Sequence, residues 1–206
     1  MDAENLFSKI KKDYKKIFLT EKRINKIAVN RDIFIAKRDI EVMYEGLFLK
    51  SITIFESFIE ELFIGLLYNN YELKTRKKIQ KHTFPNRELV LNFIKHKNKF
   101  IELMPYNKLK ESSKIFFNHN NPFVKINESS KNSLNEIYTI RNAIAHNSQF
   151  ADKKFKNLLQ NKGISNPKIL KSPALFLKSN HSTNQSIFEN YIIELNSIAR
   201  EIINFN

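Results

Sequence analysis

Three polar side chains suited to acid–base or phosphate chemistry stand within six residues in the stretch 137–150, whose first part reads as an apolar helix. Arg141 is followed directly by Asn142, and His146 comes four residues after Asn142. An imidazole ordinarily exchanges protons near neutral pH, and a guanidinium presents a planar fork of donors to a phosphate. RNA carries its own nucleophile, the 2′-hydroxyl. A histidine to move protons and an arginine to stabilise the crowded phosphorane could therefore cleave it without a metal ion.

The spacing of an arginine and a histidine carries little weight alone, because Arg76 and His82 form a similar pair. Three features distinguish the pair that begins at Arg141. A polar residue follows Arg141, whereas a lysine follows Arg76. The stretch around Arg141 has a helical apolar stripe, which would hold the site on a rigid element. Finally, the small residues Ala143 and Ala145 would let another helix approach closely.

The motif "RNAIAHN" resembles the signature of the HEPN superfamily of α-helical ribonucleases and nucleotide-binding proteins. That signature is an arginine, four to six residues and a histidine, usually with a polar residue after the arginine. An earlier helix of HEPN toxins often carries an acidic residue among aromatic ones, and "ITIFESFIEELF" is similar to that helix, with Glu56 as the candidate. The order of elements resembles the RiboL-PSP-HEPN type. The resemblance covers about residues 45–150 and the last helix.

The resemblance implies an endoribonuclease that acts in microbial defence or as a toxin, with Arg141 and His146 as catalytic residues. Asn142 would position His146 or the phosphate, and Glu56 would orient Arg141 or His146. HEPN relatives place this motif at a dimer interface, so the resemblance implies a homodimer in which two motifs line one cleft. An antitoxin or another defence protein is an expected partner. No cofactor is expected.

Helix geometry places a condition on this site. Asn142 and His146 share a helix face, but Arg141 and His146 are separated by about 140° around an ideal helix. The length of the arginine side chain, or fraying at the helix end, would have to close that gap. Two structural interpretations remain open: Arg141 pairs with Glu56 or Glu136 within the fold, and His146 caps its own helix.

The composition favours a polyanionic partner. The chain of 206 residues has 35 basic and 21 acidic residues, a net charge of +14. Such a charge attracts nucleic acid by counterion release, although a genome rich in A and T would also enrich lysine. The absence of cysteine fits a reducing cytoplasm. Neither a signal peptide nor a membrane-spanning run is expected, and His, Asp and Glu do not cluster at metal-ligand spacing.

A basic run, "KTRKKIQK", spans residues 74–81. It has five cations and no anion, and we expect it to guide RNA to the active site or, alternatively, to be a solvated loop. The candidate RNA-binding residues are Lys74, Arg76, Lys77, Lys78 and Lys81.

The spacing of apolar residues predicts an all-α fold, a helical bundle of about five or six helices in a single domain, residues 1–206. Few glycines and prolines agree with long helices. Asn86 is expected to cap the third helix, and Ser129 or Ser130 the fourth. Residues 164–183 have no helical period and predict an irregular insertion, in which "ALFLK" could be a short strand. The expected helices span residues 3–30, 32–69, 88–101, 130–148, 151–160 and 185–204.

Three functions remain open on this evidence. The first is a metal-independent endoribonuclease that leaves a 2′,3′-cyclic phosphate. The second is a HEPN-like module that binds RNA or a partner protein without cutting. The third is a structural helical subunit whose basic surface reflects only genome composition. The intact set of Arg141, Asn142 and His146 favours the first over the second.

Overall fold

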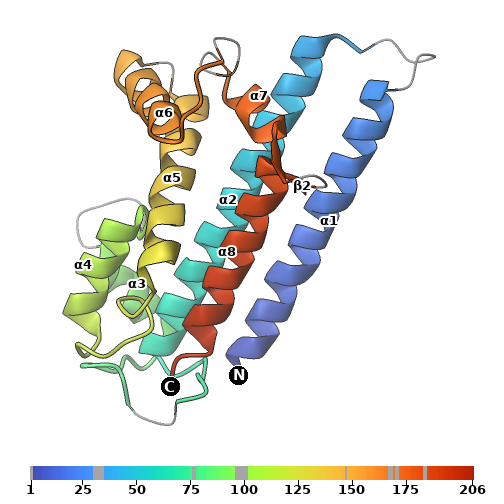
Figure 1. Cartoon of the computed structure of the whole chain (residues 1–206). Helices are drawn as coiled ribbons and strands as arrows, with labels where there is room; N and C mark the ends of the chain where they lie inside the picture. The colour runs from blue at the N-terminus through green and yellow to red at the C-terminus, as the bar shows by residue number, and fades with distance from the viewer. Residues whose placement is uncertain are drawn as a thin grey trace. The chain divides into compact units, whose positions relative to one another are not determined.

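The computed structural model describes residues 2–29, 35–75, 78–95, 102–146, 148–166, 169, 172–182 and 185–206. The all-α class is confirmed: this part of the chain has eight helices and one small two-stranded sheet (Figure 1). The helices are α1 (Ala3–Val29), α2 (Lys37–Leu67), α3 (Arg87–Lys95), α4 (Tyr106–Phe116), α5 (Glu128–Ala145), α6 (Gln149–Asn161), α7 (Pro173–Lys178) and α8 (Ile187–Ile203). Strand β1 (Asn180–Ser182) pairs antiparallel with β2 (Gln185–Ser186). None of the described helices is both long and apolar enough to cross a membrane.

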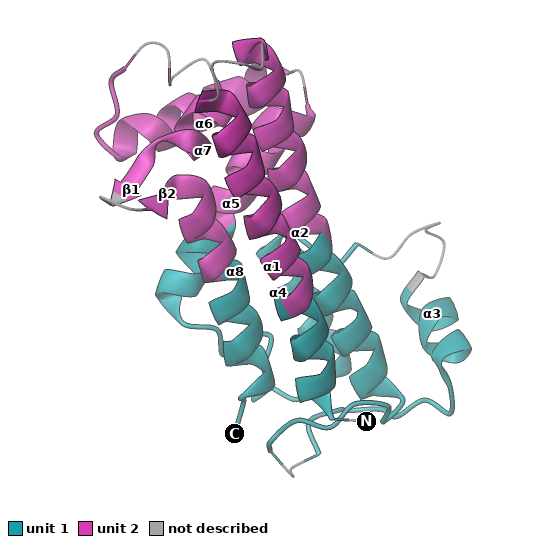
Figure 2. Ribbon diagram, turned by 90° about the vertical axis from the view of Figure 1, so that its right-hand side faces the viewer, with its two compact units in different colours: residues 1–11, 54–134, 195–206 teal, residues 12–53, 135–194 magenta. Residues whose placement is uncertain are grey.

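The chain forms two compact units (Figure 2). The first unit comprises residues 1–11, 54–134 and 195–206, and the second comprises residues 12–53 and 135–194. Helices α1, α2, α5 and α8 each contribute residues to both units, so the units are interleaved in sequence. The expectation of a single domain stays a prediction.

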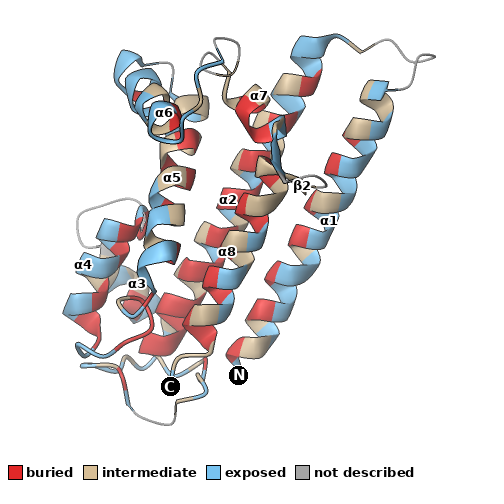
Figure 3. Ribbon diagram, in the orientation of Figure 1, coloured by how far each residue is buried: buried red, intermediate tan, exposed pale blue. Residues whose placement is uncertain are grey.

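The core of the first unit forms around the C-terminal part of α2. Residues 62–67 are all buried, as expected for a helix that is apolar on every face (Figure 3). The ring of Phe63 lies 5.0 Å from Phe117 and 5.1 Å from Phe123 between centroids, and all three residues are buried. Gly65 allows the segment that follows α2 to pack directly against the helix, because a Cβ at position 65 would lie 2.1 Å from the ring of Tyr71.

The core of the second unit includes ring contacts between α2 and α8 and between α6 and α7. The ring of Phe48 packs 6.5 Å from Phe188 and 6.2 Å from Tyr191, which ties α2 to α8. Phe155 of α6 contacts Phe176 of α7 edge to face at 6.0 Å. The apolar stripes predicted from the sequence for α2 and α8 therefore contain residues through which these two helices pack.

All six expected helices are present, with shifted ends. The Asn86 cap is confirmed, since its Oδ1 accepts a hydrogen bond from Leu89 N at 3.0 Å. Helix α5 begins at Glu128, not 130, because Asn127 is its cap: Ser130 N donates to Asn127 Oδ1 at 2.8 Å. The predictions that fall on residues 32–34 and 96–101 lie outside the described residues.

The prediction of a strand at "ALFLK" is wrong, because residues 173–178 form helix α7. Ser172 Oγ accepts a hydrogen bond from Leu175 N at 3.3 Å, and Pro173 occupies the first helical turn. A serine cap followed by proline is a helix-start signal, and it outweighs a short apolar run. Helix α4 was not expected either. Its buried positions Tyr106, Leu109, Ser113 and Phe116 keep helical spacing, but a serine interrupts the apolar stripe.

Candidate active site

Helix α5 places Arg141 and Asn142 at the surface of the second unit. Ile137 and Ile140 are fully buried, whereas Arg141 is half-buried and Asn142 is exposed. Glu136 anchors the same stretch: its Oε2 accepts a hydrogen bond from the Tyr191 hydroxyl at 2.9 Å. The same carboxylate pairs with Lys162 Nζ at 2.8 Å. The polar face is therefore presented by a helix that is fixed on its opposite side.

The anchoring hydroxyl is a stable donor. Burial raises the pKa of Tyr191 far above the ordinary tyrosine value, and the negative charge of Glu136 raises it further. Tyr191 thus stays neutral at any physiological pH and keeps its proton for Glu136. This ties α5 to α8 within the second unit.

The side chains of Arg141, Asn142 and His146 meet. Arg141 Nη1 donates to Asn142 Oδ1 at 3.2 Å, and the same nitrogen lies 3.1 Å from His146 Nε2. A guanidinium has only donors, so in this contact Nε2 carries the lone pair and accepts. The long arginine side chain closes the gap of about 140° that the ideal helix leaves. We call these three residues the Arg–Asn–His cluster.

His146 is the first residue after α5, rather than a residue within it. Its N–H donates to Asn142 O at 3.0 Å, which completes the last helical turn. Its carbonyl oxygen accepts from Ser148 N at 2.8 Å, and Ser148 Oγ caps α6 by accepting from Ala151 N at 3.2 Å. The imidazole is exposed, but its backbone is held between two helices.

The alternative pairing of Arg141 with Glu136 is not formed. The described partners of Glu136 are Tyr191 and Lys162, and those of Arg141 are Asn142 and His146. Glu56 belongs to the first unit, where it is half-buried in α2. Its expected role in orienting Arg141 or His146 stays a prediction.

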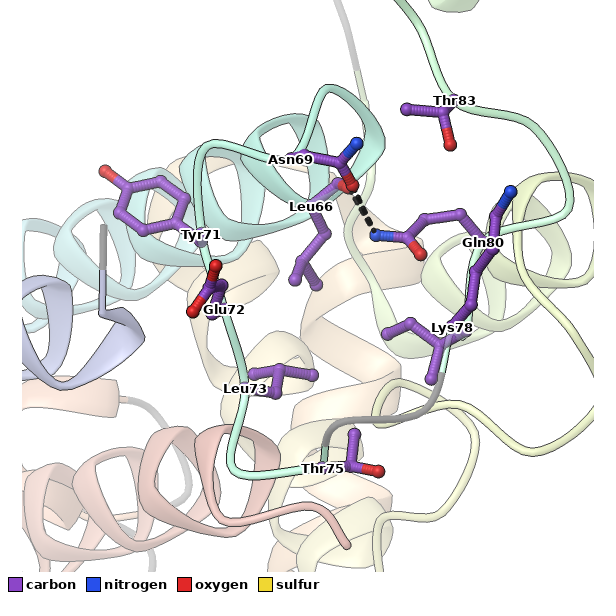
Figure 4. A pocket seen from close by; sticks show the side chains of 10 residues that line it. Leu66, Asn69, Tyr71, Glu72, Leu73, Thr75, Lys78, Gln80 and Thr83 are labelled. Carbon is purple, nitrogen blue, oxygen red and sulfur yellow. Dashed lines mark hydrogen bonds between the residues drawn. The ribbon is translucent and has the colours of Figure 1, made fainter.

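The described residues of the basic run all lie in the first unit. Lys74 Nζ is 4.0 Å from a carboxylate oxygen of Glu4, and Lys81 Nζ donates to the carbonyl oxygen of Lys114 at 2.5 Å. Lys78 is exposed and lines a cavity of about 550 Å³ (Figure 4). Arg76 and Lys77 lie outside the described residues. The ammonium groups of Lys74 and Lys81 are thus already in contact with oxygen atoms, whereas that of Lys78 forms no hydrogen bond or ion pair with a described residue.

The cavity beside Lys78 has a fixed polar wall. Gln80 Nε2 donates to the carbonyl oxygen of Leu66, in the last turn of α2, at 2.6 Å. It also lies 3.5 Å from Asn69 Oδ1 (Figure 4). Glu72 and Thr75 also line the cavity (Figure 4). Among the described residues of the lining there is no histidine.

An exposed aromatic residue near the cluster was not singled out from the sequence. Phe150 on the first turn of α6 is 68% exposed, and Lys154 Nζ lies 4.5 Å from its ring centroid. The spacing of four residues on a helix could have indicated this pair. No three His, Asp or Glu side chains of the described residues gather where they could hold a metal ion.

Comparison with known proteins identifies no relative. A scan against protein-family models found no match, and searches of curated proteins and of solved structures found none at a significant level.

Proposed function

We propose that the protein is a metal-independent endoribonuclease of the HEPN type. The observation that carries the proposal is the contact between Arg141 Nη1 and His146 Nε2 at 3.1 Å, which unites a phosphate-binding group and a proton acceptor. The net charge of +14 supports an RNA substrate. The motif's resemblance to HEPN ribonucleases supports the same reaction.

The proposed reaction uses the 2′-hydroxyl of the RNA. This oxygen attacks the adjacent phosphorus as the bond from phosphorus to the 5′-oxygen breaks. His146 Nε2 takes the 2′-proton once the phosphate has drawn the guanidinium of Arg141 away from it. Arg141 then stabilises the charge on the phosphorane oxygens. Asn142 accepts a hydrogen bond from Arg141 and so holds the arginine side chain within reach of the imidazole. The products are a 2′,3′-cyclic phosphate and a 5′-hydroxyl.

The leaving 5′-oxygen needs a proton from a second group. In the proposed homodimer, His146 of the partner subunit supplies it, because two motifs then line one cleft. A role in microbial defence or as a toxin, in the cytoplasm and with an antitoxin or defence partner, completes the proposal. A non-catalytic module that binds RNA or protein is the second candidate, favoured by the exposed Phe150 and its neighbouring Lys154.

A digest of pooled RNA separates the two candidates. The wild type should cut in EDTA and leave cyclic phosphate ends, and His146→Ala should lose roughly 10²- to 10⁴-fold in turnover while it still binds RNA. His119→Ala is the matched control, because His119 is an exposed histidine of the first unit. Full activity of folded His146→Ala would refute the assignment. So would cleavage of RNA that has a 2′-deoxy sugar at the cut site, or a strict need for magnesium.

A further inference from the structure

The second unit contains a cavity of about 460 Å³ that none of Arg141, Asn142 and His146 lines. It lies among α1, α2, α7, the small sheet and the start of α8. A volume of this size is typical of small-molecule sites, which measure roughly 300–1,000 Å³. Charged and amide side chains dominate the lining.

A buried carboxylate forms part of the lining. Glu21 is only 2% exposed. Its Oε1 accepts hydrogen bonds from the Tyr44 hydroxyl at 2.7 Å and from Asn25 Nδ2 at 2.8 Å. The described residues donate no hydrogen bond to the other carboxylate oxygen of Glu21, Oε2. A carboxylate has about four lone-pair sites, so Glu21 can accept a further hydrogen bond from a donor group of a ligand.

The neighbours of Glu21 hold it rigidly. Burial raises the pKa of Tyr44 and the charge of Glu21 raises it further, so the hydroxyl keeps its proton and remains a donor. The Tyr44 ring is itself fixed by an edge contact with Phe188 at 5.7 Å. The position of the carboxylate is therefore set before any ligand arrives.

Three lysines line the same cavity, and their ammonium groups have no partner among the described residues. The ammonium groups of Lys22, Lys26 and Lys178 form no ion pair or hydrogen bond with any described residue, and all three residues are exposed. The other acidic group of the lining, Glu189, is already engaged: its Oε2 accepts from Ser186 N at 3.1 Å. Its own N–H donates to Ser186 Oγ at 3.1 Å, which closes a capping box at the start of α8. The three ammonium groups are thus available to an anion.

We propose that this cavity binds a small hydroxylated phosphate ester, with the phosphate on Lys22, Lys26 and Lys178 and a ligand hydroxyl donating to Glu21. Three ammonium groups suit the charge of a phosphate monoester, which exceeds that of a carboxylate. A free sugar phosphate and the 5′-phosphorylated end of an RNA strand share this chemistry.

Calorimetric titration of the whole protein tests the site. Ribose 5-phosphate should bind more tightly than inorganic phosphate, and ribose alone should not bind measurably. The double variant Lys22→Ala, Lys26→Ala should weaken binding of ribose 5-phosphate by about tenfold or more, because it removes two charge-assisted contacts. Lys12→Ala, Lys15→Ala is the matched control: both lysines are exposed residues of α1 in the second unit and the charge change is the same.

Glu21→Gln tests the hydroxyl contact separately. It should reduce the preference for ribose 5-phosphate over inorganic phosphate to less than about twofold, since an amide at this position replaces one acceptor by a donor. A short RNA with a 5′-phosphate, compared with its 5′-hydroxyl form, distinguishes the two sources. Preference for the phosphorylated RNA over ribose 5-phosphate assigns the site to RNA ends, and the reverse assigns it to a free sugar phosphate.

The proposal is overturned if the wild type binds none of the phosphates. It is equally overturned if both double lysine variants lose the same affinity, because general charge would then explain binding. Retention of the full preference by Glu21→Gln would remove the ligand hydroxyl from the site and refute it as stated.

Discussion

Arg141 shows how a single long side chain completes a site that helix geometry alone leaves open. Its guanidinium contacts both Asn142 Oδ1 and His146 Nε2 from one nitrogen, Nη1. The other guanidinium nitrogens retain donors for a phosphate, and the planar fork allows a bidentate approach. The residue therefore links the binding and proton-transfer roles in the proposed mechanism.

Arg141→Lys tests this role at the residue scale. Lysine keeps the charge but loses the fork, and it is too compact a donor to bridge an amide and a phosphate together. We expect roughly 10²- to 10³-fold lower kcat, the usual loss for one donor to a developing charge, with RNA affinity nearly unchanged. Single-turnover cleavage of a fluorescent RNA measures this. Arg200→Lys, at an exposed arginine of the first unit, is the control, and wild-type turnover in Arg141→Lys would contradict the proposal.

At the scale of the element, α5 depends on a cap that the sequence interpretation placed two or three residues too late. Asn127 Oδ1 accepts from Ser130 N, and Asn127 Nδ2 donates to Glu201 Oε2 at 2.9 Å. Ser130 Oγ donates to the same carboxylate oxygen at 2.9 Å. The start of the motif helix is thus fixed to α8 within the first unit.

Asn127→Ala should lower the free energy of unfolding by about 1–2 kcal/mol, the cost of losing a helix cap. Ser129→Ala is a sharp control, because Ser129 was an equally plausible cap from the sequence but is exposed and forms no described side-chain bond. Urea denaturation followed by circular dichroism measures both variants. Equal stability of the two would show that Asn127 is not the cap.

The sequence predicted most elements because the long helices have clear apolar stripes. It predicted the three members of the cluster as candidates but left their contact undecided, since spacing gives a rotation angle and not a side-chain conformation. It missed α7, where a short apolar run fits strand and helix equally and only Ser172 and Pro173 indicated a helix. It also missed the cavity around Glu21, because its lining comes from segments far apart in sequence.

At the scale of the whole molecule, the net charge of +14 should govern affinity for RNA. Changing Lys74, Arg76, Lys77 and Lys78 to Ala should reduce the slope of log affinity against log salt by up to roughly 3, if each neutralises one phosphate of a single strand. Changing Lys9, Lys11, Lys12 and Lys15, exposed residues of α1, removes the same charge and should reduce it less. Fluorescence anisotropy across salt concentrations measures both, and equal slopes would leave the basic run as a solvated loop.

Association of two chains is the last requirement of the proposed mechanism, because the leaving oxygen needs a second proton-transfer group. The proposed interface between the two chains is the end of α5, where the side chains are small. Ala143 is half-buried there, and Ala145 is exposed. Light scattering at micromolar concentration should therefore give the mass of a dimer. Ala145→Arg should convert it to a monomer and abolish cleavage, since a long charged side chain prevents close helix approach. Ala36→Arg, at an exposed alanine before α2, should leave both mass and activity unchanged. A wild-type monomer that still cuts RNA would require the second proton to come from solvent or from the same chain.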